Sequence, residues 1–473
     1  MSEGYLLSTV NPEGPMNGIS RSVLLISTLV SCLGGFLFGY DNIVISGAIA
    51  YLAAHYRLGS AGIGWAAGCA LVGCLFGAAT AGRVADTFGL RKALYCCAGC
   101  FAMSSLGVWL AGSFAQYVTW RIVGGVGIGA ASVIAPMYIA EIAPAYIRGR
   151  LVVFYQLGIV IGILAAVSVN MLIERAGDAA WNAQYGWRLM FLVAAIPALF
   201  FGVMIALSKE SPRWLMKAGR ENEAERVLAA VSGEEAAKDQ VASIRASLVE
   251  EQGGIGELFT GRFRTALLIG FLLAALSQTS GITAILSFLP EVFKTAGQNV
   301  ADSFFQSVLV GAVNVLFTVL AIWLVDKSGR RTLILFGTAT QTIALSTIGV
   351  LYLTSDLHLG VLAGVMVFVA GHAVGNGAVC WVIISEIFPT KVRGAAMSIA
   401  TMALWIFAYL ANQFFPLMQT HWGSYGTFFF FAALAAVNFA FVLLFVPETK
   451  GYSLEEISHI WSKELGTKRR LPA

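Results

Sequence analysis

Long apolar segments alternate with short polar segments along almost the whole chain. Twelve runs have about 20 predominantly apolar residues, which is the length an α-helix needs to cross a bilayer. They lie near residues 22–42, 62–81, 93–112, 117–140, 151–173, 189–208, 265–288, 304–325, 332–353, 360–386, 394–418 and 425–446. The pattern predicts an all-α integral membrane protein with twelve transmembrane helices.

The longest polar interruption, residues 209–264, divides these runs six and six. Within it, residues 221–232 and 234–250 are rich in Glu, Arg and Ala, which favours short amphipathic helices, and Gly253-Gly254 marks a break. We therefore expect five parts: an N-terminal tail (1–21), a six-helix bundle (22–208), a helical linker (209–264), a second six-helix bundle (265–446) and a C-terminal tail (447–473).

Composition agrees with a membrane location. Charged residues make up 12% of the chain and mean hydropathy is +0.77, whereas a soluble domain carries about 25% charged residues. Lys and Arg gather in alternate loops, which sets orientation by the positive-inside rule. This side includes Arg83, Arg91, Lys92, Arg148, Arg150, the 209–264 segment, Lys327, Arg330, Arg331, Lys391, Arg393 and the C-terminal tail. Both termini should be cytoplasmic, and the net charge of +4 reflects topology and not nucleic-acid binding.

The sequence offers little chemistry of the enzymatic kind. The chain has seven cysteines. The cluster Cys96-Cys97-x-x-Cys100 has no His or carboxylate neighbours, and the thiols are interpreted as small apolar packing groups. There is no nucleotide-binding loop, no metal-ligand cluster and no nucleophile–base pair. We therefore expect no catalytic residue, no metal and no cofactor.

The two halves of the chain repeat each other. Three pairs of motifs stand about 240 residues apart: GRVADTFGLRK (82–92) with WLVDKSGRRT (323–332), EIAPAYIRGR (141–150) with EIFPTKVRGA (386–395), and KESPRWL (209–215) with PETKGYS (447–453). Such a parallel duplication is typical of a two-bundle transporter whose site lies between the halves.

These loop motifs together resemble the sugar porter family of the major facilitator superfamily, over residues 22 to 456. Within the family, FGYDNIVISGA, PMYIAEIAP and VCWVIISEIFP are similar to the bacterial xylose–proton symporters. The resemblance implies the major facilitator fold, a sugar substrate and alternating access.

Asp41 is the only ionisable group in residues 33–47. A carboxylate inside a membrane span is costly and by default functional. Arg121, at the start of the fourth run, is its natural partner, and the resemblance implies that the two are close. A carboxylate beside arginine stays ionised, and one moved away in an apolar setting takes up a proton. We interpret Asp41 and Arg121 as the proton-coupling pair, with a permanent structural ion pair as the alternative.

The resemblance also implies the sugar site. Gln156, Asn314 and Trp381 match family positions, with helix–helix hydrogen bonding or packing as the alternative for each. In the seventh run Gln278 is retained, but Ser277, Thr283 and Ser287 replace family residues, as does Leu404 in the eleventh. We expect a roomier, less polar pocket that takes an unusual monosaccharide, a deoxy sugar, a polyol or cyclitol, or a small glycoside.

Charged residues in the paired loops are the expected gate. The resemblance implies that they pair across the two bundles and separate when the protein opens inward; the alternative is that they only set topology. The candidates are Asp86, Glu141, Arg148, Glu210, Asp326, Arg330, Glu386, Arg393 and Glu448. Thr87, Leu90 and Lys209 depart from the family pattern, which predicts a weaker gate in the first half.

Together these features favour a proton-coupled symporter for a monosaccharide or related polyol in a bacterial inner membrane. Its partners are then the sugar or polyol, the proton and membrane lipid, and a monomer is expected. The alternatives are a facilitative uniporter with a structural Asp41, and a sugar-binding sensor with little transport.

Overall fold

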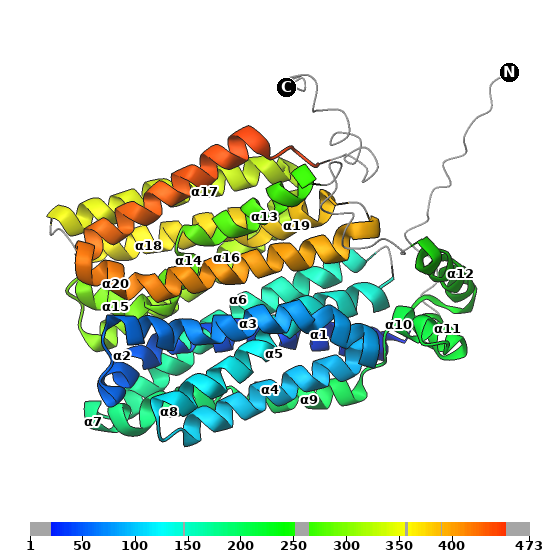
Figure 1. The fold of residues 1–473 in the computed structure, drawn as a ribbon, viewed down its shortest axis with the longest axis horizontal. Coiled ribbons are helices and arrows are strands. Elements are labelled where there is room, and N and C mark those ends of the chain that lie inside the picture. Colours follow the sequence, from blue (N-terminus) through cyan, green and yellow to red (C-terminus); the bar gives the residue numbers. More distant parts are fainter. Residues whose placement is uncertain (1–19, 145–146, 251–263, 355–357, 389, 451–473) are drawn as a thin grey trace.

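The computed structural model describes residues 20–144, 147–250, 264–354, 358–388 and 390–450. Within these ranges the chain is helical, and the helices form two groups that lie side by side, with the three linker helices at one end (Figure 1). We call that end of the bundles the linker end and the opposite end the far end.

The first group contains the helices before the linker. Its members are α1 (Arg21–Ile43), α2 (Ile45–Tyr56), α3 (Ser60–Phe88), α4 (Leu90–Leu110), α5 (Phe114–Ile142), α6 (Arg148–Ala176), α7 (Ala179–Trp181), the π-helix η1 (Asn182–Gly186), α8 (Trp187–Leu192) and α9 (Ala195–Leu207). The linker follows with α10 (Pro212–Lys217), α11 (Glu221–Ser232) and α12 (Glu234–Glu250).

The second group begins with α13 and ends with α20. Its members are α13 (Arg264–Thr279), α14 (Ile282–Ser287), α15 (Leu289–Thr295), α16 (Val300–Ser328), α17 (Arg330–Thr354), α18 (His358–His372), the π-helix η3 (Ala373–Gly377), α19 (Ala378–Glu386) and α20 (Thr390–Phe445).

The helices account for the twelve predicted crossings. Among the described residues, 11 helical stretches are long and apolar enough to span a membrane, and the last, Ala396–Phe445, has 50 residues. At 1.5 Å per residue that stretch is about 75 Å long, against a hydrocarbon core of about 30 Å. It bends at Gly423, where φ is 68°, and Figure 1 shows the two arms of α20 crossing the second group in opposite directions. It therefore supplies the eleventh and twelfth crossings, and the predicted fold is confirmed.

The linker prediction is confirmed as well, since residues 221–232 and 234–250 form α11 and α12. α11 buries Ala224, Val227, Leu228 and Val231 along one face, as the spacing of its apolar residues requires. Gly253-Gly254 lies outside the described residues.

Two glycine seams hold the first bundle together. In each seam, a side chain on any of the glycines would strike a backbone carbonyl of the facing helix. Small residues allow membrane helices to approach this closely. The α1–α6 seam contains Gly35, Gly39, Gly158 and Gly162, and the α3–α5 seam contains Gly73, Gly77, Gly125 and Gly129. α1 and α6 therefore form one tightly joined pair, and α3 and α5 form another.

The two bundles meet at the far end. There Ser60 Oγ lies 2.8 Å from Thr420 Oγ1, and Gln413 Nε2 donates to the Ala61 carbonyl at 3.0 Å. One buried apolar cluster joins Leu52 of the first bundle to Phe293 and other residues of the second.

Toward the linker end, each bundle has a core of its own. The core of the first bundle includes Ala85 and Leu94 and reaches α20 at Trp405 and Ala408. The core of the second includes Leu333 and other residues of α13, α17, α19 and α20. The hydrogen bonds of Ser60 and Gln413 thus join the bundles at the far end, whereas toward the linker end each bundle packs mainly on its own core.

Candidate functional site

Asp41 and Arg121 form a buried ion pair in the first bundle. Asp41 lies in the last turn of α1 and Arg121 in the third turn of α5. Arg121 Nη1 donates to Asp41 Oδ2 at 2.8 Å, and Nη2 donates to the Asp41 carbonyl at 3.0 Å. The two residues are 3% and 1% exposed. The structure therefore brings together the two residues predicted to couple transport to protons.

The surroundings of the pair are mostly apolar. The Arg121 guanidinium carbon lies 5.0 Å from the centre of the Phe191 ring, and Arg121 Nε has no hydrogen-bond partner among the described residues. A β-carbon on Gly124 would come 3.5 Å from Asp41 Oδ2 and would strike the Ser104 hydroxyl, so glycine keeps room beside the carboxylate. An ionised carboxylate without its arginine would be costly in this site, and protonation is the usual relief.

Gln278 and Thr283 are joined across a break between two helices. α13 ends at Thr279, and Gly281 with φ 76° turns the chain into α14. Across that turn Thr283 Oγ1 donates to Gln278 Oε1 at 2.6 Å. A β-carbon on Gly281 would lie 2.8 Å from the ring of Phe431, so both the left-handed backbone and the close packing require glycine.

Asn314 and Gln156 lie on the two helices that meet between the bundles. α16 packs on α6 where Gly311 faces Leu164 and Val167. Asn314, one turn from Gly311 toward the linker end, is 6% exposed. Gln156 on α6 is half-buried and is also on the linker side of that contact.

Trp381 is half-buried on α19. Neither Trp381, Asn314 nor Gln156 has a side-chain hydrogen bond to another described residue.

Two buried polar residues near these positions were missed by the sequence analysis. Trp405, next to Leu404, is 2% exposed, and its indole nitrogen has no partner among the described residues. Its ring meets Phe38 edge-on at 5.5 Å across the two bundles. Asn376 in η3 is 3% exposed, and neither of its amide atoms has a partner in the described part of the chain. The sequence signal that could have identified them is a side chain with polar atoms inside an apolar run.

Glu210 and Glu448 cap equivalent helices in the two halves. Glu210 Oε1 accepts from the Arg91 and Ser211 backbone N–H groups at 3.0 Å each. Glu448 accepts from the Arg330 and Arg331 N–H groups at 2.9 and 3.1 Å. The Arg91, Arg330 and Arg331 N–H groups open α4 and α17, and a carboxylate there satisfies free donors and the helix dipole.

Two arginines in equivalent positions complete these caps. Arg91 Nη2 donates to the Ala206 carbonyl at 2.7 Å, and Arg331 Nη2 to the Leu443 carbonyl at 2.7 Å. The same arrangement of a capping glutamate and an arginine bonded to a carbonyl thus occurs in both halves of the chain, and each copy lies within one bundle.

The remaining gate candidates also contact their own bundle or the linker. Asp86 pairs with Lys217 of α10 at 2.8 Å, with both side chains about half exposed or more. Glu141 accepts from the Ser211 hydroxyl. Arg148 is exposed. The side chains of Asp326 and Arg393 lie outside the described residues, so their predicted gating contacts stay predictions.

The departure at Leu90 produces a difference between the halves. Arg330 Nη2 lies 3.6 Å from Glu386 Oε1. The repeat places Leu90 where Arg330 stands, and Glu141 where Glu386 stands. Since Leu90 is an apolar side chain buried at 3% exposure, the first half lacks the equivalent ion pair. The ion pairs of Asp86 and Arg330 each lie within one bundle or reach the linker, and contacts of the gate candidates across the two bundles stay a prediction.

The sequence is similar to a family of transporters and to individual proton symporters. The model of the family "Sugar (and other) transporter" matches residues 27–461. The D-xylose-proton symporter of Escherichia coli (strain K12) is 37% identical, over 94% of this chain and 97% of its own length. The arabinose-proton symporter of Bacillus subtilis (strain 168) is 40% identical, over 92% of this chain and 95% of its own length.

The fold is likewise similar to a solved structure. It matches the xylose transporter XylE from E. coli in a partially occluded inward open conformation, with a TM-score of 0.82 and 36% identity. The match covers 91% of this chain and 100% of that one.

Proposed function

The chain belongs to the sugar (and other) transporter family, and from that premise we propose that it is a proton-coupled symporter for a monosaccharide or related polyol. The observation that carries the proposal is the buried ion pair of Asp41 and Arg121. Two similar proteins are named as proton symporters for pentoses, D-xylose and arabinose, which supports the same class of reaction here.

The proposed transport cycle is alternating access with the site between two six-helix bundles, 22–208 and 265–446. With the linker and both termini in the cytoplasm, as the distribution of Lys and Arg indicates, the described state faces inward. Moving the bundles apart at the far end and together at the linker end would present the site to the outside. The gate candidates would then meet across the bundles, and a network of them would bias this equilibrium.

Asp41 is the proposed proton carrier. In the described state Arg121 donates one hydrogen bond to the Asp41 carboxylate and one to the Asp41 backbone carbonyl, and the first is a charge-assisted hydrogen bond. When the bundle rearranges and the distance between the two side chains grows, the carboxylate binds a proton from the side to which it is then open. Return of Arg121 releases that proton, so that proton and substrate cross together.

Gln156, Gln278, Thr283, Asn314 and Trp381 are the proposed substrate contacts. Each pairs a polar group with burial or half-burial in the membrane, and a sugar hydroxyl both donates and accepts hydrogen bonds. Because Thr283 already donates to Gln278, the Gln278 amide is held in one orientation before substrate arrives. Such preorganisation lowers the entropic cost of binding.

The test is proton movement driven by substrate. Liposomes containing the protein would receive a panel of monosaccharides, polyols and cyclitols in a lightly buffered medium, and external pH would be recorded. We expect alkalinisation with the transported compound. Asp41→Asn should abolish the pH change while exchange of labelled for unlabelled substrate persists. Asp239→Asn, which removes an exposed acid of the linker, is the matched control and should behave like the wild type.

Two results would contradict the proposal. Uptake without a pH change, equally fast in Asp41→Asn, would identify a uniporter in which Asp41 and Arg121 are structural. Substrate binding without exchange would identify a sensor.

A further inference from the structure

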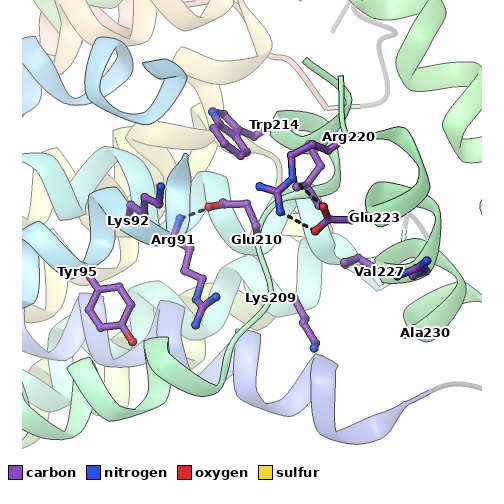
Figure 2. A pocket seen from close by; sticks show the side chains of 12 residues that line it. Arg91, Lys92, Tyr95, Lys209, Glu210, Trp214, Arg220, Glu223, Val227 and Ala230 are labelled. Atoms are coloured by element: carbon purple, nitrogen blue, oxygen red, sulfur yellow. Dashed lines mark hydrogen bonds and ion pairs between the residues drawn. The ribbon is translucent and has the colours of Figure 1, made fainter. Parts of the chain in front are cut away.

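A cavity of about 890 Å³ lies at the linker end, outside the sugar site and the proton-coupling pair. The start of α4, the segment between α9 and α10, and the linker helices α10 and α11 surround it, as Figure 2 shows. The volume is within the range of known ligand pockets. None of the residues proposed to bind sugar or proton lines it.

The lining carries an excess of positive charge. Its cations are Arg91, Lys92, Lys209, Arg220 and Arg226, against the two acids Glu210 and Glu223. Both acids are already engaged. Glu210 accepts from backbone N–H groups, and Glu223 accepts twice from Arg220, at 2.8 and 2.6 Å.

Three of the cations have no ion-pair partner among the described residues. They are Lys92, Lys209 and Arg226, all with exposed side chains, from α4, the segment before α10, and α11. Lys209 stands where the family pattern has proline, so it adds a cation to this particular chain. Like charges repel each other, and an anion bound among them offsets that repulsion. A shared anion would therefore stabilise the three cations.

The cavity also has aromatic walls, beside the first turns of the spanning helix α4. Tyr95, one turn after Arg91 on the spanning helix α4, is 38% exposed, and Trp214 of α10 lies across from it. Trp and Tyr are enriched at membrane interfaces, and clusters of Lys and Arg there attract anionic headgroups. The Trp214 indole N–H donates to the Asp86 carbonyl, so this wall is held in place.

We propose that this cavity binds a phosphate group, carried by the headgroup of an anionic phospholipid or by a soluble phosphate ester. The phosphate would lie among Lys92, Lys209 and Arg226 and neutralise them. Since these residues belong to a spanning helix and to the linker, the bound group would fasten the linker to the first bundle.

The test measures binding of phosphatidylglycerol to the purified full-length chain. Native mass spectrometry would compare retained phosphatidylglycerol with retained phosphatidylcholine, with and without glycerol 3-phosphate as competitor. Lys209→Ala/Arg226→Ala removes two exposed cations of the site. A membrane-surface cation contributes about 1 kcal/mol, or about fivefold in affinity. The double variant should therefore bind about 25-fold more weakly, and Lys209→Arg should bind like the wild type.

The matched control is Lys238→Ala/Arg175→Ala, which removes the same charges from exposed positions outside the cavity and should leave binding unchanged. Preferential retention of phosphatidylglycerol that survives glycerol 3-phosphate supports a lipid source. Displacement by glycerol 3-phosphate, with thermal stabilisation that the double variant loses, supports a soluble source. Equal retention of both lipids with no stabilisation by glycerol 3-phosphate would overturn the proposal, as would a double variant indistinguishable from the wild type.

Discussion

At the residue scale, Asp41 shows how much one side chain in an unusual setting reveals. Its carboxylate was predicted to pair with Arg121 because burying an unpaired charge is costly, and the structure has the two at 2.8 Å. The same reasoning did not find Trp405 or Asn376. Their side chains are uncharged and are common in membrane helices as packing groups, so only their unpaired buried atoms distinguish them.

Thr283→Val tests the substrate site at this scale. The change keeps the branched shape and removes the hydroxyl that donates to Gln278 Oε1. A net hydrogen bond is worth about 0.5–1.5 kcal/mol, so we expect the apparent KM to rise about threefold to tenfold with little change in maximal rate. The measurement is exchange of labelled substrate over a range of concentrations.

The control for that experiment is Thr347→Val on α17. Thr347 is exposed, and its hydroxyl bonds the carbonyl of Ile343 in its own helix. If Thr283→Val changed the maximal rate and left the KM untouched, Thr283 would act in the conformational step and not in binding.

At the element scale, the apolar runs predicted every spanning helix, because length and hydrophobicity alone decide whether a helix spans. They did not predict where helices break. The breaks at Gly281, between α14 and α15, and at η3 depend on packing against neighbours, which a single run does not record. The loop acids illustrate the same limit: the sequence identified Glu210 and Glu448, but their partners are backbone N–H groups that only the packed helix ends supply.

Glu448→Ala should destabilise the second bundle. The carboxylate accepts from the N–H groups that open α17 and from those of Thr449 and Lys450. Loss of a helix cap costs about 0.5–2 kcal/mol, so the thermal unfolding midpoint should fall. The midpoint of Glu448→Gln, which keeps one acceptor oxygen, should fall less.

Glu235→Ala on the exposed face of α12 provides the comparison and should leave the midpoint unchanged. An unchanged midpoint in Glu448→Ala would show that the cap contributes nothing to stability.

At the scale of the whole molecule, the internal repeat predicted two similar bundles, and the family match and the fold agree with it. The conformational state could not be predicted from sequence. Two conformations of one chain differ in free energy by a few kcal/mol. This difference is small beside the sum of the many contacts at the far end, so the sequence does not show which conformation is preferred.

A cross-link at the far end tests this state. Ser60→Cys/Thr420→Cys replaces the two hydroxyls that lie 2.8 Å apart. Oxidation should join the bundles and stop transport, because the far end can no longer open, and reduction should restore it. Initial uptake rates before and after each treatment are the measurement.

Each single cysteine variant serves as its control, since seven native cysteines remain in the chain. Full transport by a completely cross-linked protein would mean that the far end does not open during the cycle.

The glycine seams place the two partners of the ion pair on different helix pairs. Asp41 belongs to the α1–α6 pair and Arg121 to the α3–α5 pair. Backbone contact restrains movement within each pair, so we expect the two pairs to move against each other more readily than either pair deforms. Such movement changes the distance between the carboxylate and the guanidinium. In the proposed cycle it would therefore control protonation of Asp41, and a methyl group added within either seam should alter that coupling.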